Sequence, residues 1–195
     1  MLRNKIIIAC CSCAVTMSSV LAGVCENIDA LTTRTTPTER FVIHDDAPVI
    51  TDRATNLMWA RCPLKLERVE GIDYFNVDWV AEINRCANPT NFNYFTWKEA
   101  LNFDASNLDE QMQLYSGWRL PNMKELSSIV ERSCTQPAIN SELFPGANTG
   151  QFWTSTPASG EEIWAVNFSN GLEGYVHLLR RGPLVRLVRD ITPGE

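Results

Sequence analysis

The sequence predicts an α+β domain with a mainly antiparallel sheet, two helices and two disulfides. The order of the elements is the first observation: strand patterns come first, two helix patterns follow, and a second series of strands ends the chain. Alternating strand and helix patterns would instead predict a parallel sheet. The second observation is a pair of complete helix-start signals in mid-chain. The third is the even number of cysteines left once an export signal is removed.

The first 22 residues have the pattern of a signal peptide. Arg3 and Lys5 precede an apolar run that ends in Val20-Leu21-Ala22, with residues permitted at a cleavage site. We expect cleavage after Ala22 and export to the periplasm, the cell surface or the medium, with no stable membrane span afterwards. An uncleaved anchor is disfavoured because serines and threonines interrupt the run. Lipoprotein processing at Cys25 is disfavoured because a valine directly precedes it.

After cleavage, the chain is expected to divide into an N-terminal arm, a single domain and a short tail. Residues 23–38 are polar and rich in threonine and form the arm, residues 39–190 form the domain, and residues 191–195 form the tail. A domain of this length can bury a hydrophobic core. There are no internal repeats.

Four of the seven cysteines remain after cleavage: Cys25, Cys62, Cys86 and Cys134. An even number in an exported protein predicts two disulfides, for which three pairings exist. We favour Cys62–Cys86 as a local clip and Cys25–Cys134 as a tie between the arm and the end of the central helix. Metal binding is the competing interpretation, but no Cys-x-x-Cys remains and the chain has only two histidines.

The first half of the domain carries three short strand patterns, residues 41–44, 48–51 and 56–60. Two aspartates between the first two strands predict a hairpin turn. Residues 63–94 are irregular in pattern and predict a long loop held by the first disulfide. Within that loop, residues 77–83 fit a short helix.

Two capping boxes predict the starts of the helices: Thr96 with Glu99, and Asn122 with Glu125. The first helix is expected over residues 97–103. The second is expected over residues 123–133, where apolar residues recur at helical spacing.

A second strand series follows a loop-rich stretch. Its strands are expected at residues 151–155, 163–168, 174–179 and 185–189. The Ser-Asn-Gly at residues 169–171 predicts a tight turn between the second and third of them.

Motifs spread over residues 39–190 resemble those of the family of the C-terminal domain of the Legionella collagen-like adhesin, also called DUF1566. In order, they are Arg40-Phe41, Val49 to Asp52, Leu57 to Trp59 with Cys62, Thr96 to Leu101, Gly117 to Leu126, Phe152 to Thr156, Trp164 to Phe168 and Val185 to Arg189. The resemblance implies a C-type-lectin-like fold, shared with sulfatase-modifying-factor domains. It also implies exported bacterial proteins, some of which act in adhesion and bind sulfated polysaccharides. Residues 45–48 depart from the family pattern, which has a glycine-rich turn there.

The residue pattern argues against an enzyme. Formylglycine-generating enzymes share the implied fold but need reactive cysteines in the C-terminal part, and none follows Cys134. His44 and His177 are the only candidate bases, and neither lies in a nucleophile motif. The carboxylate pairs Asp45-Asp46 and Glu161-Glu162 are adjacent in sequence, so in a strand they would point to opposite faces. An enzyme of unrecognised type is the least favoured alternative.

No cofactor or metal is expected either. The closest match to the calcium motif of C-type lectins is Gln136-Pro137-Ala138, which lacks the final carboxylate. Removal of the signal changes the net charge from −6 to −8, because Arg3 and Lys5 leave with it. Nucleic-acid binding usually shows a basic footprint, so we do not expect that class of partner.

Most aromatic and cationic residues of the motifs are expected to be structural. Core packing is expected for Trp59, Trp97, Trp118, Trp153 and Trp164. Trp79 lies in the segment between Cys62 and Cys86 and is the better surface candidate. Arg119, Arg186 and Arg189 are expected to form ion pairs or to bind backbone carbonyls.

The candidate ligand-binding residues are His177, Arg180 and Arg181, at a turn between two predicted strands. Guanidinium groups suit bidentate contacts with sulfate or carboxylate, although a solvated turn is an equally good explanation. We expect a non-catalytic module for adhesion or surface recognition, with its ligand on the loops between residues 140 and 182. The ligand would be a glycan, sulfated or not, or a surface protein. The alternative is an accessory structural domain of an envelope or surface appendage that acts through protein–protein contacts.

Overall fold

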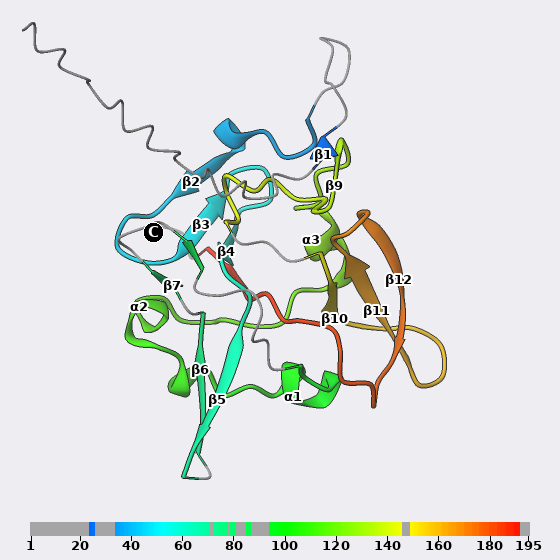
Figure 1. Cartoon of the computed structure of the whole chain (residues 1–195). Helices are drawn as coiled ribbons and strands as arrows, with labels where there is room; N and C mark the ends of the chain where they lie inside the picture. Colours follow the sequence, from blue (N-terminus) through cyan, green and yellow to red (C-terminus); the bar gives the residue numbers. More distant parts are fainter. Residues whose placement is uncertain are drawn as a thin grey trace, which may run out of the picture.

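A computed structural model describes residues 24–25, 34–70, 72–77, 79–80, 85–86, 94–145 and 149–191. Its two larger sheets are antiparallel, with strand orders β13-β4-β3-β2 and β10-β11-β12 (Figure 1). Short helices lie beside them, so the α+β class with mainly antiparallel pairing is confirmed. The predicted signal peptide lies outside the described residues, as does most of the predicted tail.

The four-stranded sheet joins the start of the domain to its end. Its strands are β2 (Phe41–Ile43), β3 (Val49–Asp52), β4 (Leu57–Ala60) and β13 (Val188–Asp190). The three early strands confirm the prediction, whereas regular pairing of the last strand begins only at Val188 rather than at residue 185. Asp52 stabilises the β3–β4 turn, since its carboxylate accepts from Ala54 N at 3.0 Å and Thr55 Oγ1 at 2.7 Å and pairs with Arg40.

The three-stranded sheet is made by consecutive strands. They are β10 (Gln151–Pro157), β11 (Glu162–Asn167) and β12 (Leu172–His177), and they confirm the predicted strands of this region. Gly171, in the predicted turn, has φ 72°. A Cβ at this position would lie 2.7 Å from Val130 Cγ1, so both the backbone angle and the close packing require glycine.

The described part of the chain contains three α-helices: α1 (Trp97–Leu101), α2 (Glu110–Gln113) and α3 (Met123–Ser127). Short 3₁₀ turns η1 (Thr38–Arg40) and η3 (Ala105–Asn107) accompany them. Both predicted capping boxes are formed at the starts of α1 and α3. The short α2 was not predicted, and both predicted helices are too long.

After α3 the chain makes one looser turn, in which Ile129 and Val130 donate to the carbonyls three residues before them at 3.4 and 3.2 Å. The backbone N–H of Glu131 donates to Ala138 O at 3.1 Å instead of continuing the helical ladder. Its carboxylate is buried and binds residues of the N-terminal arm. The apolar periodicity continues to Val130 because Ile129 and Val130 lie in this looser turn and pack in the core.

The segment between Cys62 and Cys86 is more regular than predicted. It contains the hairpin β5 (Lys65–Val69) and β6 (Ile72–Asn76), which projects from the body in Figure 1, and the short pair β7 (Trp79–Val80) and β8 (Arg85–Cys86). The predicted helix over residues 77–83 is wrong where the structure describes it, because Trp79 and Val80 pair with β8. The disulfide Cys62–Cys86 is present, as predicted.

The arm docks onto the domain at two places. Strand β1 (Val24–Cys25) pairs with β9 (Cys134–Thr135), and Cys25 lies directly opposite Cys134 in the register. Opposed residues of antiparallel strands are close enough for a disulfide, so the backbone supports the predicted second bridge, which stays a prediction. Farther along the arm, Thr36 is fully buried against Glu131.

Two hydrophobic clusters fill the domain. One lies between α1, α2 and the two sheets and contains Trp118 and Trp153; the other lies beneath α3 and contains Trp59. The predicted core role of these three tryptophans is confirmed. Trp97 is half-buried against the first cluster, while Trp164 belongs to neither cluster and is only partly buried, although it shares a side of its sheet with buried Val166.

Candidate functional site

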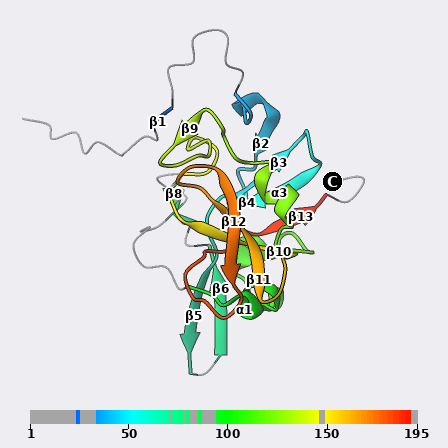
Figure 2. The same ribbon diagram turned by 90° about the vertical axis from the view of Figure 1, so that its right-hand side faces the viewer.

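The three predicted ligand-binding residues lie at one end of the three-stranded sheet. His177 ends β12, and Arg180 and Arg181 lie in the turn that follows; all three are exposed. Strand β12 is an edge strand of its sheet and faces the viewer in Figure 2. The turn is held against α1, because Trp97 N donates to Leu178 O at 3.4 Å.

Arg181 is paired with a carboxylate of α1. Its Nη2 lies 2.5 Å from Glu99 Oε1, and its Nη1 donates to Tyr94 O at 3.0 Å. Glu99 also closes the capping box with Thr96. Burial acts to raise the pKa of Glu99, but the hydrogen bonds from Thr96 and the charge of Arg181 outweigh it, so the pKa is lowered. Arg181 therefore faces a carboxylate that stays ionised, which offsets its charge.

His177 is also paired with an acid. Its Nε2 lies 3.1 Å from Glu161 Oε2, while its Nδ1 accepts from the backbone N–H of Leu179 at 3.2 Å. Because Nδ1 accepts, the ring proton of neutral His177 lies on Nε2 and points to Glu161. Of the three candidates, only Arg180 has a side chain with no hydrogen bond or ion pair among the described residues.

An aromatic pair lies on the same strands. Trp164 of β11 and Tyr175 of β12 face each other in the register, with ring centroids 4.4 Å apart and planes tilted by 56°. Tyr175 is 60% exposed. The expectation of core packing fails for Trp164, which shares a side with exposed Tyr175. The alternation of the flanking buried residues, Ile163 and Val176, is the sequence signal that could have shown this.

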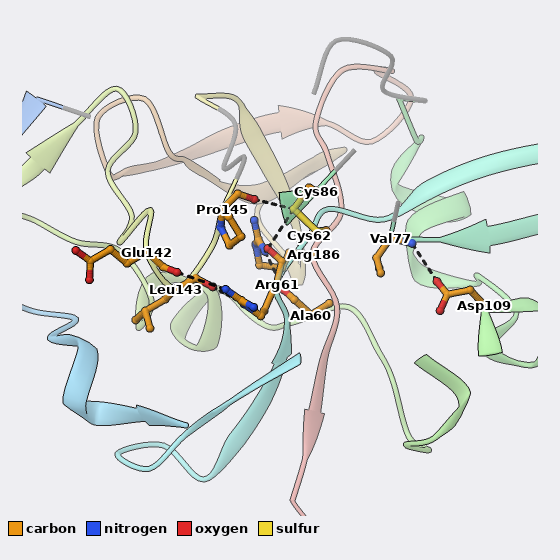
Figure 3. Close-up of a disulfide and its surroundings, with 10 residues drawn as sticks. All are labelled: Ala60, Arg61, Cys62, Val77, Cys86, Asp109, Glu142, Leu143, Pro145 and Arg186. Atoms are coloured by element: carbon orange, nitrogen blue, oxygen red, sulfur yellow. Dashed lines mark hydrogen bonds between the residues drawn. A yellow bond between two sulfur atoms is a disulfide. The ribbon is translucent and has the colours of Figure 1, made fainter. Parts of the chain in front are cut away.

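Two buried arginines surround the Cys62–Cys86 disulfide, as Figure 3 shows. Arg186 Nη1 donates to Ala60 O at 2.8 Å and to Arg61 O at 2.7 Å, and burial lowers the pKa of Arg186 to about 9. Its guanidinium lies over the rings of Phe144 and Phe152, at 4.9 and 5.5 Å from their centroids.

Arg61 supports the same region. Its Nε donates to Leu143 O at 2.9 Å, and its guanidinium stacks on Trp79 at 4.8 Å. Trp79, the surface candidate, is thus half-buried against the core. Because both guanidiniums are buried against backbone carbonyls and aromatic rings, Arg61 and Arg186 have a structural role.

The other motif arginines are structural, as predicted. Arg119 binds Glu125 of the capping box through two hydrogen bonds of 2.8 and 2.9 Å and also pairs with Asp190. These hydrogen bonds raise the pKa of Arg119, against the opposing effect of burial. Arg189 Nε donates to Ser116 O at 2.7 Å.

The second histidine lies in a small polar cluster that the sequence did not suggest. His44 Nε2 lies 2.9 Å from Thr51 Oγ1, and His44 Nδ1 lies 3.3 Å from the hydroxyl of Tyr115. The cluster fixes the β2–β3 hairpin against the segment after α2. Within the described ranges, no group of three or more histidines, cysteines or carboxylates could hold a metal ion. In the same ranges no helix is long and apolar enough to cross a membrane.

The fold and the site together define a disulfide-clipped α+β domain that presents charged and aromatic side chains along the edge of a small antiparallel sheet. Comparison with protein families gives its identity: the family model of the Lcl C-terminal domain matches residues 48–189, and the chain belongs to this family. The family resemblance of the motifs is thereby confirmed. Comparison of the sequence with curated proteins found no match.

Proposed function

We propose that the protein is an exported, non-catalytic binding module for adhesion or surface recognition, with a glycan, sulfated or not, or a surface protein as its ligand. Membership of the Lcl C-terminal domain family supports the adhesive role. The disulfide supports an oxidising, extracytoplasmic environment. The proposal includes the C-type-lectin-like fold that the sequence motifs imply.

The observation that carries the proposal is the exposed strand β12 and its turn. This segment presents a cation without an ion partner among the described residues, Arg180, next to a histidine and an exposed tyrosine. Its backbone is fixed by pairing with β11 and by the contact with α1. Loops held on a rigid scaffold in this way commonly carry binding function.

The second candidate is an accessory structural domain of an envelope or surface appendage, which works through protein contacts. Exposed leucines favour it: Leu172, at the start of β12, is 58% exposed, and Leu179, in the turn between His177 and Arg180, is 68% exposed. Apolar side chains exposed at a sheet edge are a feature of protein-binding surfaces.

A glycan array that includes sulfated polymers separates the two candidates. We expect the mature protein to bind, and Arg180→Ala to reduce binding to sulfated glycans. Arg53→Ala is the matched control, because Arg53 is an exposed arginine in a turn far along the chain from β12. The double variant Arg180→Ala/Arg181→Ala is the less specific test, since it also breaks the pair with Glu99.

Binding to no glycan, together with co-purification of an envelope protein, would favour the structural candidate instead. Intact mass of the exported protein tests the remaining expectations. A chain that begins at Gly23 and is about 4 Da lighter than its reduced form has lost the signal and formed two disulfides, since each bridge removes two hydrogens. An N-terminal lipid or free thiols would contradict them.

A further inference from the structure

One stretch of the three-stranded sheet leaves aromatic rings facing solvent. Helix α3 covers the part near Val166, which is fully buried, and Ser127 of α3 donates to Glu173 of β12 at 2.9 Å. Farther along the same side lie Trp164 and Tyr175, and we call this pair the aromatic platform. Figure 2 shows the outer strand β12 in front of β11, with α3 beside their upper part.

The platform presents the ring of Tyr175 to solvent. Trp164 supports it from the neighbouring strand at a centroid distance of 4.4 Å, and the register fixes both residues opposite each other. Because the face of an aromatic ring carries partial negative charge, it attracts the weakly positive C–H groups of an apolar surface. One face of a pyranose ring offers such C–H groups, while its hydroxyls point outward.

The ionisable groups around the platform are paired with one another. Glu173 and His177 lie two residues before and after Tyr175, so all three side chains share one side of β12. His177 is paired with Glu161, and Glu173 is paired with Arg132 at 3.3 Å. Burial acts to raise the pKa of Glu173, but hydrogen bonds from Ser127, from its own backbone and from Arg132 lower it.

Glu173 therefore stays ionised at neutral pH. Because Arg132 is already paired with Glu173, and His177 with Glu161, a sulfate or carboxylate group directly over the rings would find no unpaired cation among these groups. Carboxylate and imidazole groups suit sugar hydroxyls, since they accept and donate hydrogen bonds. Charge complementarity thus selects an uncharged sugar over an anionic one.

We propose that the aromatic platform stacks an uncharged pyranose ring of a polysaccharide, with His177 and Glu161 bonding its hydroxyls. The inference rests on the proposed function in that it assumes a glycan ligand, and it assigns the principal contact to Tyr175 and not to the arginines. Binding through a stacked uncharged ring does not depend on ion pairs. It is therefore insensitive to salt, whereas contacts through Arg180 weaken as salt rises.

The test is titration calorimetry of the mature protein with cellohexaose and chitohexaose as uncharged probes and heparin as the sulfated probe, each at low and high salt. We expect an uncharged probe to bind with an affinity that salt leaves unchanged. Tyr175→Ala should weaken that affinity at least tenfold, and Tyr175→Phe should retain it. Leu114→Ala is the matched control, because Leu114 is 61% exposed, follows α2 instead of lying in β12, and should bind like the wild type.

Circular dichroism of each variant reports whether it is folded, so that lost binding is assigned to the platform. Binding of heparin alone, without cellohexaose or chitohexaose, overturns the platform and leaves the proposed function standing. Equal binding of an uncharged probe by the wild type and Tyr175→Ala also overturns the platform. Absence of binding to all three probes, and to the glycan array, overturns the platform and the glycan ligand together.

Discussion

Replacing Glu131 by glutamine should loosen the N-terminal arm, because this carboxylate binds the arm to the segment after α3. Glu131 is only 2% exposed, and it accepts hydrogen bonds from backbone and side chain of Thr36, both at 2.9 Å. Ser133 and Thr35 add further donors, including Ser133 Oγ at 2.7 Å. Glutamine would place an N–H₂ group opposite some of these N–H donors, which would then lack an acceptor.

The pKa gives the size of the effect. Burial acts to raise the pKa of Glu131, but the hydrogen bonds from Ser133 and Thr36 outweigh it and hold the pKa at about 2, against an ordinary value of 4.5. At about 1.4 kcal/mol per unit of pKa, this difference corresponds to about 3 kcal/mol of stabilisation. Thr35 and Ser133 are reached by solvent, so we expect a measured loss of about 2 kcal/mol.

The contribution depends on pH in a defined direction. Because folding lowers the pKa of Glu131, its stabilisation is complete above pH 4.5 and is lost as the pH falls toward 2. Urea unfolding should therefore show Glu131→Gln less stable than the wild type at neutral pH, with the difference shrinking across this range. Hydrogen exchange at the Thr36 amide should become faster in the variant.

Glu142→Gln is the control, because Glu142 is exposed and accepts a single side-chain hydrogen bond, from Thr38 at 3.1 Å. It should change the free energy of unfolding by less than about 0.5 kcal/mol. Equal stability of Glu131→Gln and the wild type at neutral pH would refute the reasoning. So would a difference that persists unchanged at pH 2.

Two further predictions test the fold. Gly171→Ala should lower the free energy of unfolding by at least about 2 kcal/mol in thermal or urea unfolding, since its Cβ would lie 2.7 Å from Val130. Gly160→Ala is the control: Gly160 has φ 65° but its Cβ would meet nothing within 4 Å, so the loss should be about 1 kcal/mol. Equal losses for the two variants would contradict the packing argument. Replacing both Cys62 and Cys86 by serine should lower the unfolding free energy by about 3 kcal/mol, given their separation of 24 residues, and an unchanged melting temperature would contradict this.

The elements that the sequence predicted correctly are those that depend on neighbouring residues. The capping boxes at Thr96 and Asn122 and the turn at Gly171 involve partners within a few positions, and each is formed as expected. Short runs rich in apolar and β-branched residues likewise placed β10, β11 and β12, although β10 buries three successive residues, Phe152 to Thr154. The helix predicted over residues 77–83 failed, since pairing with β8 overrides a weak local preference.

The sequence predicted that the three candidate residues lie together in an exposed turn, but it did not predict their ion pairs. His177, Arg180 and Arg181 do lie together and exposed at the end of β12. Arg181 finds its carboxylate partner 82 residues earlier in the chain, at Glu99. A residue so distant leaves no periodic or spacing signal, so the charge of the predicted cationic patch could not be judged from the sequence.

By itself, the sequence determined the family, the α+β class, the starts of two helices, the Cys62–Cys86 clip and the structural role of the motif arginines. Each of these depends on short-range chemistry or on a pattern of motifs in order. Tertiary structure alone decided that helical bonding stops at Glu131, whose carboxylate is held by Thr36, 95 residues away. It also decided that Trp164 supports exposed Tyr175. Which part of the sheet α3 covers depends on packing between segments that are distant in the sequence.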